Sequence, residues 1–164
     1  MNIDVENTIK DKDLIQLVTF CLGEEEFGFD IFKVKEINKM MELASVPNSP
    51  SFVEGVANLR GRIIPVLDLR NKLGMKKKNY DDDTRIIVIE IHTQTVGFIV
   101  DRVNEVLRIS QNITEPPPEI VTSIESEFIT AIAKLENRLL ILLDLEKVLT
   151  KEEINTATKT INKV

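Results

Sequence analysis

Short runs of apolar residues recur along the chain and are separated by glycine, asparagine and aspartate. They cover residues 14–22, 62–67, 85–91 and 138–143. Short runs that are rich in β-branched residues and bounded by turn formers are typical of β-strands. Residues 86–89, Ile-Ile-Val-Ile, show no polar alternation, which predicts a strand that is buried on both faces or lies in a barrel wall.

Two features modify this all-β pattern. Pro65 interrupts one apolar run, and because proline cannot donate to a ladder, we expect its strand at a sheet edge or at a bulge. Residues 30–39 carry Ile31, Val34 and Ile37 at approximately helical spacing, so a short helix is predicted there.

Helix caps can be placed at three further points. Asp68 can cap a short helix that ends near residue 73, before Gly74, and residues 144–149 repeat this arrangement. Thr150 and Glu153 have the spacing of a capping box, which predicts a polar C-terminal helix. The Glu-Pro-Pro-Pro-Glu sequence at 115–119 is expected to be an extended loop.

The chain also contains an internal repeat. Residues 59–69 match residues 135–145 at an offset of 76, sharing a leucine, an arginine and Leu-Asp-Leu. Residues 28–37 match residues 97–106, and residues 15–20 match 86–91 more weakly. Three pairs in the same order indicate a duplicated unit of about 70 residues, which is too long for a solenoid repeat. We therefore expect two similar lobes that pack together.

The expected organisation follows from this repeat. Residues 1–13 are a polar, flexible N-terminal segment, residues 14–80 form the first lobe, residues 81–150 form the second, and residues 151–164 form the C-terminal helix or tail. Three lysines at 76–78 followed by three aspartates at 81–83 are typical of a solvated connector.

Composition narrows the possible functions. The chain has 164 residues and a net charge of -6, which disfavours a general nucleic-acid binder because such affinity comes largely from lysine and arginine on phosphates. No stretch approaches the roughly 18 apolar residues of a membrane span, and the N-terminus does not have the pattern of a secretory signal. We expect a cytoplasmic protein without an internal disulfide, since Cys21 is the single cysteine.

Residue types that carry chemistry are sparse. His92 ends an apolar run beside turn formers and is expected on the surface, while Cys21 lies in an apolar run and is expected to be a buried structural residue. The acidic runs do not have the ligand spacing of a calcium loop, and no glycine-rich phosphate loop occurs. The sequence therefore predicts no catalytic, metal or cofactor site and favours a binding module.

Two other classes remain open. One is a small enzyme with a site built from Asp101, Glu105 and Arg60. The other is a nucleic-acid binder on SH3-like barrels, which would need a basic face with exposed aromatic residues; aromatic residues make up 5% of the chain and tryptophan is absent.

Residues 52–70, which include Asn-Leu-Arg-Gly, resemble the signature segment of the CheW family. Residues 27–37, 96–101 and 139–145 resemble other recurring segments of that family, so that the resemblance runs from about residue 14 to residue 149. It implies a mostly β fold of two packed SH3-like five-stranded barrels with short helices and a C-terminal helix.

The resemblance also implies a non-catalytic chemotaxis adaptor. Its partners would be the cytoplasmic tip of a methyl-accepting chemoreceptor and the regulatory domain of the histidine kinase CheA. The protein would be recruited from the cytoplasm to membrane-associated receptor arrays without inserting into the membrane. The length leaves no room for phosphotransfer, ATPase or receiver domains, so a stand-alone CheW protein is favoured over an isolated CheA regulatory domain.

The same resemblance assigns functional residues. Receptor binding or its support is assigned to six positions: Val34, Glu36, Gly55, Asn58, Arg60 and Gly61. A kinase contact is assigned to Glu119 and Ile120, and a second kinase contact is expected from an apolar barrel end of the first lobe. The alternative for residues 115–120 is a plain surface loop.

Physical chemistry is compatible with the receptor assignment. Val34 offers an apolar contact, and the Arg60 guanidinium can donate to a carboxylate or carbonyl of a helix. Glycine at 55 and 61 permits tight turns or close backbone approach. Arg60 and Gly61 correspond in the repeat to Glu136 and Asn137, as expected if one lobe alone carries this site. The alternative is that Arg60 pairs with a neighbouring carboxylate on a turn.

Overall fold

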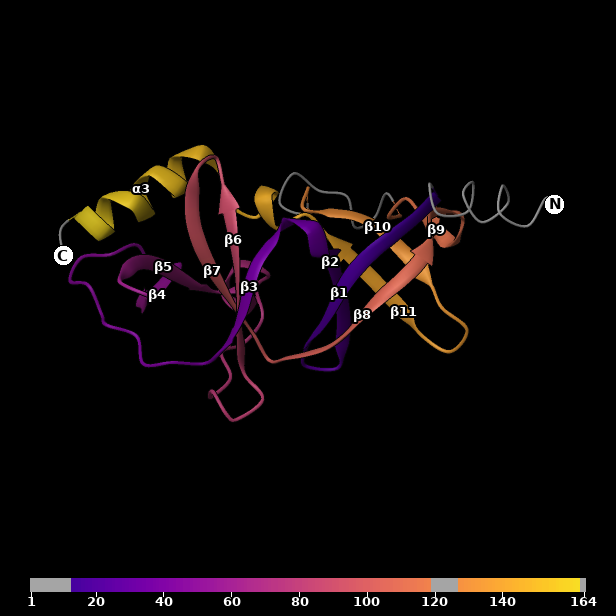
Figure 1. Ribbon diagram of the computed structural model, residues 1–164, viewed down its shortest axis with the longest axis horizontal. Coiled ribbons are helices and arrows are strands. Elements are labelled where there is room, and N and C mark those ends of the chain that lie inside the picture. Colours follow the sequence, from indigo (N-terminus) through magenta and orange to yellow (C-terminus); the bar gives the residue numbers. More distant parts are fainter. Residues whose placement is uncertain (1–12, 119–126, 163–164) are drawn as a thin grey trace.

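The structure is a computed structural model that describes residues 13–118 and 127–162 (Figure 1). The strands are β1 (Leu14–Leu22), β2 (Glu25–Asp30), β3 (Val34–Lys39), β4 (Val53–Leu59), β5 (Arg62–Asp68), β6 (Arg85–Ile91), β7 (Gln94–Val100), β8 (Arg102–Ser110), β9 (Thr114–Glu115), β10 (Ile129–Lys134) and β11 (Leu139–Leu143). The helices are α2 (Leu69–Lys72) and α3 (Lys151–Asn162), with 3-10 turns η1 (Ile31–Lys33), η2 (Gln111–Ile113) and η5 (Leu145–Lys147).

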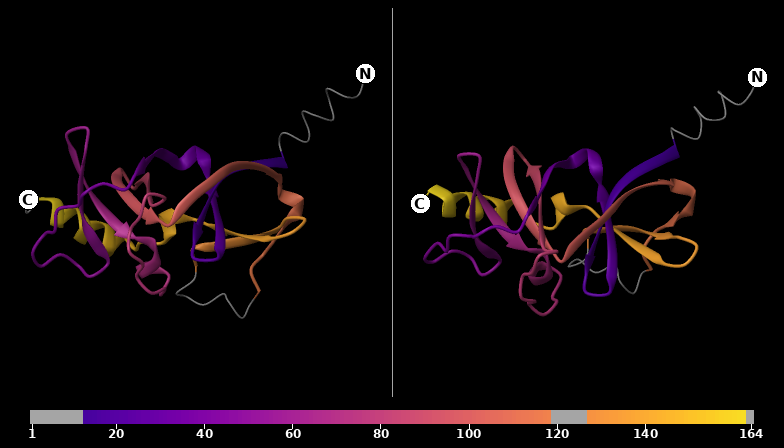
Figure 2. Two further views of the ribbon diagram at one scale, coloured as in Figure 1. Left: turned by 90° about the horizontal axis from the view of Figure 1, so that it is seen from below. Right: turned by 60° about the horizontal axis from the view of Figure 1, so that its bottom comes forward.

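These strands form two sheets, each the framework of one lobe. Sheet A has the order β8-β1-β2-β11-β10-β9, and sheet B has the order β3-β6-β7-β5-β4. Lobe A lies on the right of Figure 1 and lobe B on the left, where α3 covers it; Figure 2 shows the same separation from two other directions. The expected mostly β fold of two packed lobes is confirmed, and the two-residue strand β9 adds a sixth strand to sheet A.

The pairing registers establish the duplication. Gly28 of β2 lies beside Leu142 of the parallel strand β11, and Gly97 of β7 lies beside Val66 of the parallel strand β5. These are the residues that the repeat aligns. The weak third match is displaced by two residues. Thr19 pairs with Gly28, and the residue that pairs with the equivalent Gly97 is Val88, whereas the sequence match had aligned Thr19 with Glu90. A two-residue shift keeps every side chain on its own face of a strand, so the apolar pattern alone did not reveal it.

Each sheet takes strands from both copies of the repeat. The hairpin β1–β2 comes from the first copy but pairs with β8 and β11 of the second, whereas β6–β7 of the second copy pairs with β3 and β5 of the first. The sheets therefore do not follow the division of the chain at residue 80. The chain passes between the sheets twice, from β2 through η1 to β3 and from β7 to β8.

Three apolar clusters fill the molecule. The largest, the central core, takes residues from both sheets, among them Phe20, Phe29, Ile87 and Phe98. A smaller inner core lies within each lobe: Ala57, Ile64, Val66, Ile86, Val88 and Ile99 in lobe B, and Leu17, Ile109, Ala133, Leu140 and Leu142 in lobe A. The exchanged hairpins face the central core with one side and an inner core with the other, which confirms that residues 86–89 are buried on both faces.

One local prediction was wrong and another was wrong in part. Residues 30–39 form η1 followed by β3 rather than a helix, because burial alternates with a period of two along β3. Pro65 lies in β5, which is not an edge strand, since it pairs with β4 on one side and β7 on the other. A shift in the register of β4 does lie opposite Val66 and Leu67, directly after Pro65, as the alternative of a bulge expected. The parallel pairing with β7 begins only at Val66, so the missing proline donor does not interrupt that ladder.

The predicted caps are present. The Asp68 side chain accepts from the Arg70 backbone N–H, and the Asp144 side chain accepts in the same way from Glu146. Thr150 and Glu153 form both bonds of a capping box, each of 3.1 Å. These caps fix where each chain segment turns away from its sheet.

An ion pair fixes each crossing between the sheets. At the β7–β8 crossing, the Arg70 guanidinium donates two hydrogen bonds to the Asp101 carboxylate, of 2.8 and 2.6 Å. That carboxylate also accepts from the Gly23 backbone N–H. At the β2–β3 crossing, Lys33 lies 3.4 Å from Glu146, which is the counterpart of Arg70 in the repeat. The Arg70 and Asp101 side chains are each 12% exposed, against 43% and 39% for Lys33 and Glu146, so the first pair is screened far less by water.

The Asp101 pair predicts a pH-dependent stability. Burial raises the pKa of Asp101, but the hydrogen bonds from Arg70 and Gly23 outweigh it, so that the folded pKa lies below the ordinary value. The stabilisation is therefore complete above the unfolded pKa of about 3.9 and is lost as pH falls through the folded pKa. Asp101→Asn should lower the free energy of unfolding by about 1.5–3 kcal/mol at pH 7, and this difference should shrink below about pH 4.

Urea unfolding of both proteins from pH 7 to pH 3 measures this difference. The matched control is Glu146→Gln at the exposed Lys33–Glu146 pair of the other crossing, which should cost less than about 1 kcal/mol. Equal losses for the two variants at pH 7 would contradict the distinction between the crossings.

Candidate functional site

The β4–β5 hairpin carries four of the residues assigned to receptor binding, and three of them lie at or next to its turn. Its two-residue turn places Arg60 at φ 53° and Gly61 at φ 86°, the left-handed values that such a turn requires at both positions. The Asn58 side-chain oxygen accepts from the Gly61 backbone N–H at 2.9 Å. Asn58 and Gly61 thus hold the turn that presents Arg60, whose side chain is 83% exposed.

Glu36 of β3 lies opposite this turn. One of its carboxylate oxygens is 3.9 Å from the Arg60 Nη1 atom, and the other accepts a 2.6 Å hydrogen bond from the Asn38 side-chain amide. Arg60 therefore does have a neighbouring carboxylate, as the alternative required, but the long contact and high exposure leave guanidinium donors free for a partner. Asn38 was not identified from the sequence, although its position two residues after Glu36 places it on the same face of a strand.

A depression of about 230 Å³ joins the two strands at this point. It is lined by Lys35, Glu36, Leu59, Arg60, Arg62, Ile64, Val88 and Thr95. Its floor is apolar, and its rim carries both charges, with Arg62 donating to the Thr95 hydroxyl at 3.1 Å. This combination suits a helix surface that has an apolar stripe flanked by polar side chains.

Val34 and Gly55 have supporting positions. Val34 follows η1, is half-buried and packs against the central core. Only the remaining part of its surface is therefore accessible to a partner. A Cβ atom on Gly55 would lie 2.8 Å from the Ala44 carbonyl oxygen. Gly55 therefore permits the chain at Ala44 to pair with Val56 through two 2.9 Å hydrogen bonds.

Lobe A has a different arrangement at the positions equivalent to this site. Arg138, the counterpart of Arg62, donates to Glu26 at 2.7 Å and lies 3.9 Å from Glu105, the counterpart of Glu36. Asn104 also donates to Glu26, at 2.9 Å. Arg138, Glu26 and Glu105 thus pair within lobe A, whereas the Arg60 side chain of lobe B projects into solvent.

Two apolar side chains are exposed at equivalent positions in each lobe. In lobe B they are Ile37 and Ile63, which are 37% and 42% exposed; in lobe A they are Val106 and Leu139, which are 54% and 60% exposed. Their neighbours Ile64 and Leu140 lie in the inner cores, and successive residues of a strand face opposite ways. The four side chains therefore point outward. The repeat could have identified them, because Ile63 and Leu139 share one offset and Ile37 and Val106 share the other.

The residues considered for catalysis lie in separate clusters of contacts. Asp101 pairs with Arg70, Glu105 lies near Arg138, and Arg60 lies near Glu36. Within residues 13–118 and 127–162, no group of three or more histidine, cysteine, aspartate or glutamate side chains could hold a metal ion. His92 is exposed in the β6–β7 turn and Cys21 is buried, as expected.

Two assignments lie outside the described residues, namely Glu119 and Ile120. Before them, Glu115 ends β9, and the three prolines at 116–118 belong to neither a helix nor a strand. In the described part of the chain, no helix is both long and apolar enough to cross a membrane.

Comparison with known proteins gives a consistent result. The CheW-like domain family matches residues 16–153. The chemotaxis protein CheW of Klebsiella aerogenes is 40% identical over 85% of this chain and 84% of its own length. The chemotaxis protein CheW of Bacillus subtilis is 36% identical over 87% of this chain and 91% of its own length.

The structural comparison agrees. The crystal structure of the scaffolding protein TtCheW from Thermoanaerobacter tengcongensis superimposes with a TM-score of 0.75 and 43% identity, covering 82% of this chain and 91% of that one. The chemotaxis protein CheV3 of Helicobacter pylori is 32% identical over 94% of this chain, which spans 54% of its length. The similarity to the CheW proteins thus extends over most of both chains.

The Gly55 contact generates a test of the supporting role. Gly55→Ala should lower the free energy of unfolding by about 1–3 kcal/mol, because the added methyl group overpacks against the Ala44 carbonyl. Gly61→Asn is the matched control, since asparagine tolerates a positive φ and occupies the equivalent position 137; it should change stability by less than about 1 kcal/mol. Chemical denaturation measures both, and a Gly55→Ala protein as stable as the wild type would contradict the close approach.

Proposed function

The chain belongs to the CheW-like domain family of chemotaxis scaffold proteins, and from this premise we propose that it couples the cytoplasmic tips of chemoreceptors to the regulatory domain of the histidine kinase CheA. It acts without catalysing a reaction of its own, in the cytoplasm and at membrane-associated receptor arrays. The receptor half of this proposal rests on one observation, which is that the exposed Arg60 side chain projects from the buried framework of lobe B.

The receptor surface is the depression between β3 and the β4–β5 hairpin. A receptor tip is a helical hairpin, and a helix binds most readily to an apolar floor with a charged rim. Leu59, Ile64 and Val88 supply the floor. Arg60 supplies the donors, and Glu36 holds Arg60 over the rim while Asn38 orients the Glu36 carboxylate.

The kinase surface uses the outward apolar side chains. Ile37 follows Glu36 directly in β3, so it lies on the opposite face from the receptor depression. Ile37 and Ile63 give lobe B an apolar outer surface, and Val106 and Leu139 give lobe A an equivalent one. A CheA regulatory domain of the same fold would carry a matching surface, and burial of such side chains stabilises an interface.

Arg60→Ala tests the receptor surface. Truncating an interface anchor costs about 2 kcal/mol or more, so binding of a purified receptor cytoplasmic fragment should weaken by about 30-fold or more. Binding of the CheA regulatory domain should be unchanged. Isothermal titration with each partner separates the two outcomes.

The control for this variant is Lys39→Ala, which removes an exposed cation from β3, the strand that carries Glu36, at a position outside the depression, and it should leave receptor binding within twofold. A loss of less than twofold for Arg60→Ala would place the receptor site elsewhere.

Ile63→Glu tests the kinase surface. A charge placed in a buried apolar contact is strongly unfavourable, so the affinity for the CheA regulatory domain should fall by at least about tenfold. Receptor binding should persist, because Ile63 points away from the inner core and does not line the depression. Leu139→Glu asks the same question of lobe A, and kinase binding that is unaffected by either variant would exclude both surfaces as kinase contacts.

A further inference from the structure

The inner core of lobe B is completed by a tyrosine. Tyr80 packs against the cluster of Ala57, Ile64 and Val66, and its hydroxyl donates a 3.1 Å hydrogen bond to the Asp68 carboxylate. The other oxygen of that carboxylate accepts from the Arg70 backbone N–H and so caps α2. Burial and the neighbouring carboxylates of Asp68 and Glu54 raise the pKa of Tyr80, which keeps the phenol protonated as a donor.

The inner core of lobe A has the same construction. Ala133, Leu140 and Leu142 stand where lobe B has Ala57, Ile64 and Val66. Asp144 stands where lobe B has Asp68, and one of its oxygens accepts from the Glu146 backbone N–H at 3.1 Å. Thr130 takes the place of Glu54, and Asp30 takes the place of Ile99.

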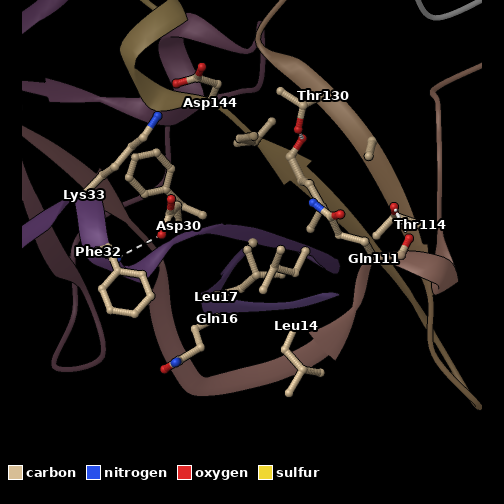
Figure 3. Close-up of a pocket in the computed structure, with 16 residues that line it drawn as sticks. Leu14, Gln16, Leu17, Asp30, Phe32, Lys33, Gln111, Thr114, Thr130 and Asp144 are labelled. Atoms are coloured by element: carbon tan, nitrogen blue, oxygen red, sulfur yellow. Dashed lines mark hydrogen bonds between the residues drawn. The ribbon is translucent and has the colours of Figure 1, made fainter. Parts of the chain in front are cut away.

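At the position corresponding to the tyrosine ring, lobe A has a cavity of about 450 Å³. Its apolar wall includes Leu14, Leu17 and Leu142, and its polar edge includes Asp144, Thr130 and Gln111. Figure 3 shows Asp144 and Thr130 on the side opposite Leu14 and Leu17. The volume falls within the range of about 300–1,000 Å³ that is usual for ligand sites.

The Asp144 carboxylate distinguishes this cavity from a packing defect. Among residues 13–118 and 127–162, only the Glu146 backbone N–H bonds to the Asp144 side chain, so its second oxygen is available to a donor. In lobe B the corresponding oxygen holds the Tyr80 hydroxyl. The cavity therefore offers an apolar wall and a charged acceptor in the arrangement that holds a phenol in its twin.

We propose that this cavity binds a tyrosine side chain that a partner protein presents. The occupant must come from another molecule, because Tyr80 is the single tyrosine of this chain and already occupies lobe B. The cavity exceeds the volume of one ring, so a flanking apolar residue of the partner enters with it. Phe32, which lines the cavity and is 77% exposed, supplies an aromatic surface at its mouth for the backbone of the incoming segment.

The test uses p-cresol, which is the side chain of tyrosine, and toluene, which has no donor. Each is titrated into the full-length protein while the methyl resonances of Leu14, Leu17 and Leu142 are followed by NMR. We expect saturable shifts of these methyl groups, with p-cresol binding at least fivefold tighter than toluene. The Asp144→Asn variant, which keeps a good helix cap, should reduce that preference to less than twofold.

The matched control is Asp68→Asn in lobe B, where Tyr80 already uses the acceptor; it should leave the preference for p-cresol unchanged. Three results would overturn the proposal. They are shifts that do not saturate, equal affinities for the two compounds in the wild-type protein, and nuclear Overhauser contacts showing that a segment of this chain fills the cavity and is not displaced by p-cresol.

Discussion

The central core is the constraint on which the rest of this structure depends. It forms because each exchanged hairpin is apolar on both faces: Ile86 and Val88 face the inner core of lobe B, while Ile87 and Ile89 face the central core. A strand with two apolar faces is stable only when both are covered. Neither sheet can complete itself from one copy of the repeat, so the two lobes form one packed unit although they look separate in Figure 1.

In this arrangement the inward positions of the two copies must stay apolar, whereas the outward and turn positions can differ. The inward positions of both copies carry apolar residues of similar size, such as Ile64 and Leu140. The outward and turn positions are free of that packing requirement, and there the copies have opposite chemistry, with Arg60 in one turn and Glu136 in the other. Thr95 and its counterpart Glu26 complete the contrast, because only Glu26 can neutralise the arginine that stands at the same position in both hairpins. The two similar lobes thus present different surfaces on one shared framework.

Much of this could be predicted from local sequence, and the failures have a common cause. Caps at Asp68, Asp144 and Thr150 were predictable because a cap depends on residues within three positions of one another. The strand β3 was mistaken for a helix because its exposed edge carries Ile37 among charged residues, so the period of two is visible only once burial is known. The exchange of hairpins depends on pairing between Gly28 and Leu142, a contact between distant residues that no local pattern encodes.

The candidate site shows the same limit at the level of single side chains. Arg60 and Gly61 of the β4–β5 turn carried a recognisable signal, but Glu36, the neighbour of Arg60, lies on a strand for which the sequence pattern predicted a helix. β3 and β4 are the two edge strands of sheet B, so the sheet must curl to bring Glu36 to that turn, with Asn38 directed to the same carboxylate. The contact between Arg60 and a carboxylate 24 positions away exists only once the lobe has folded. The turn can be identified from sequence because it is local, whereas the orientation of its side chain is a property of the assembled lobe.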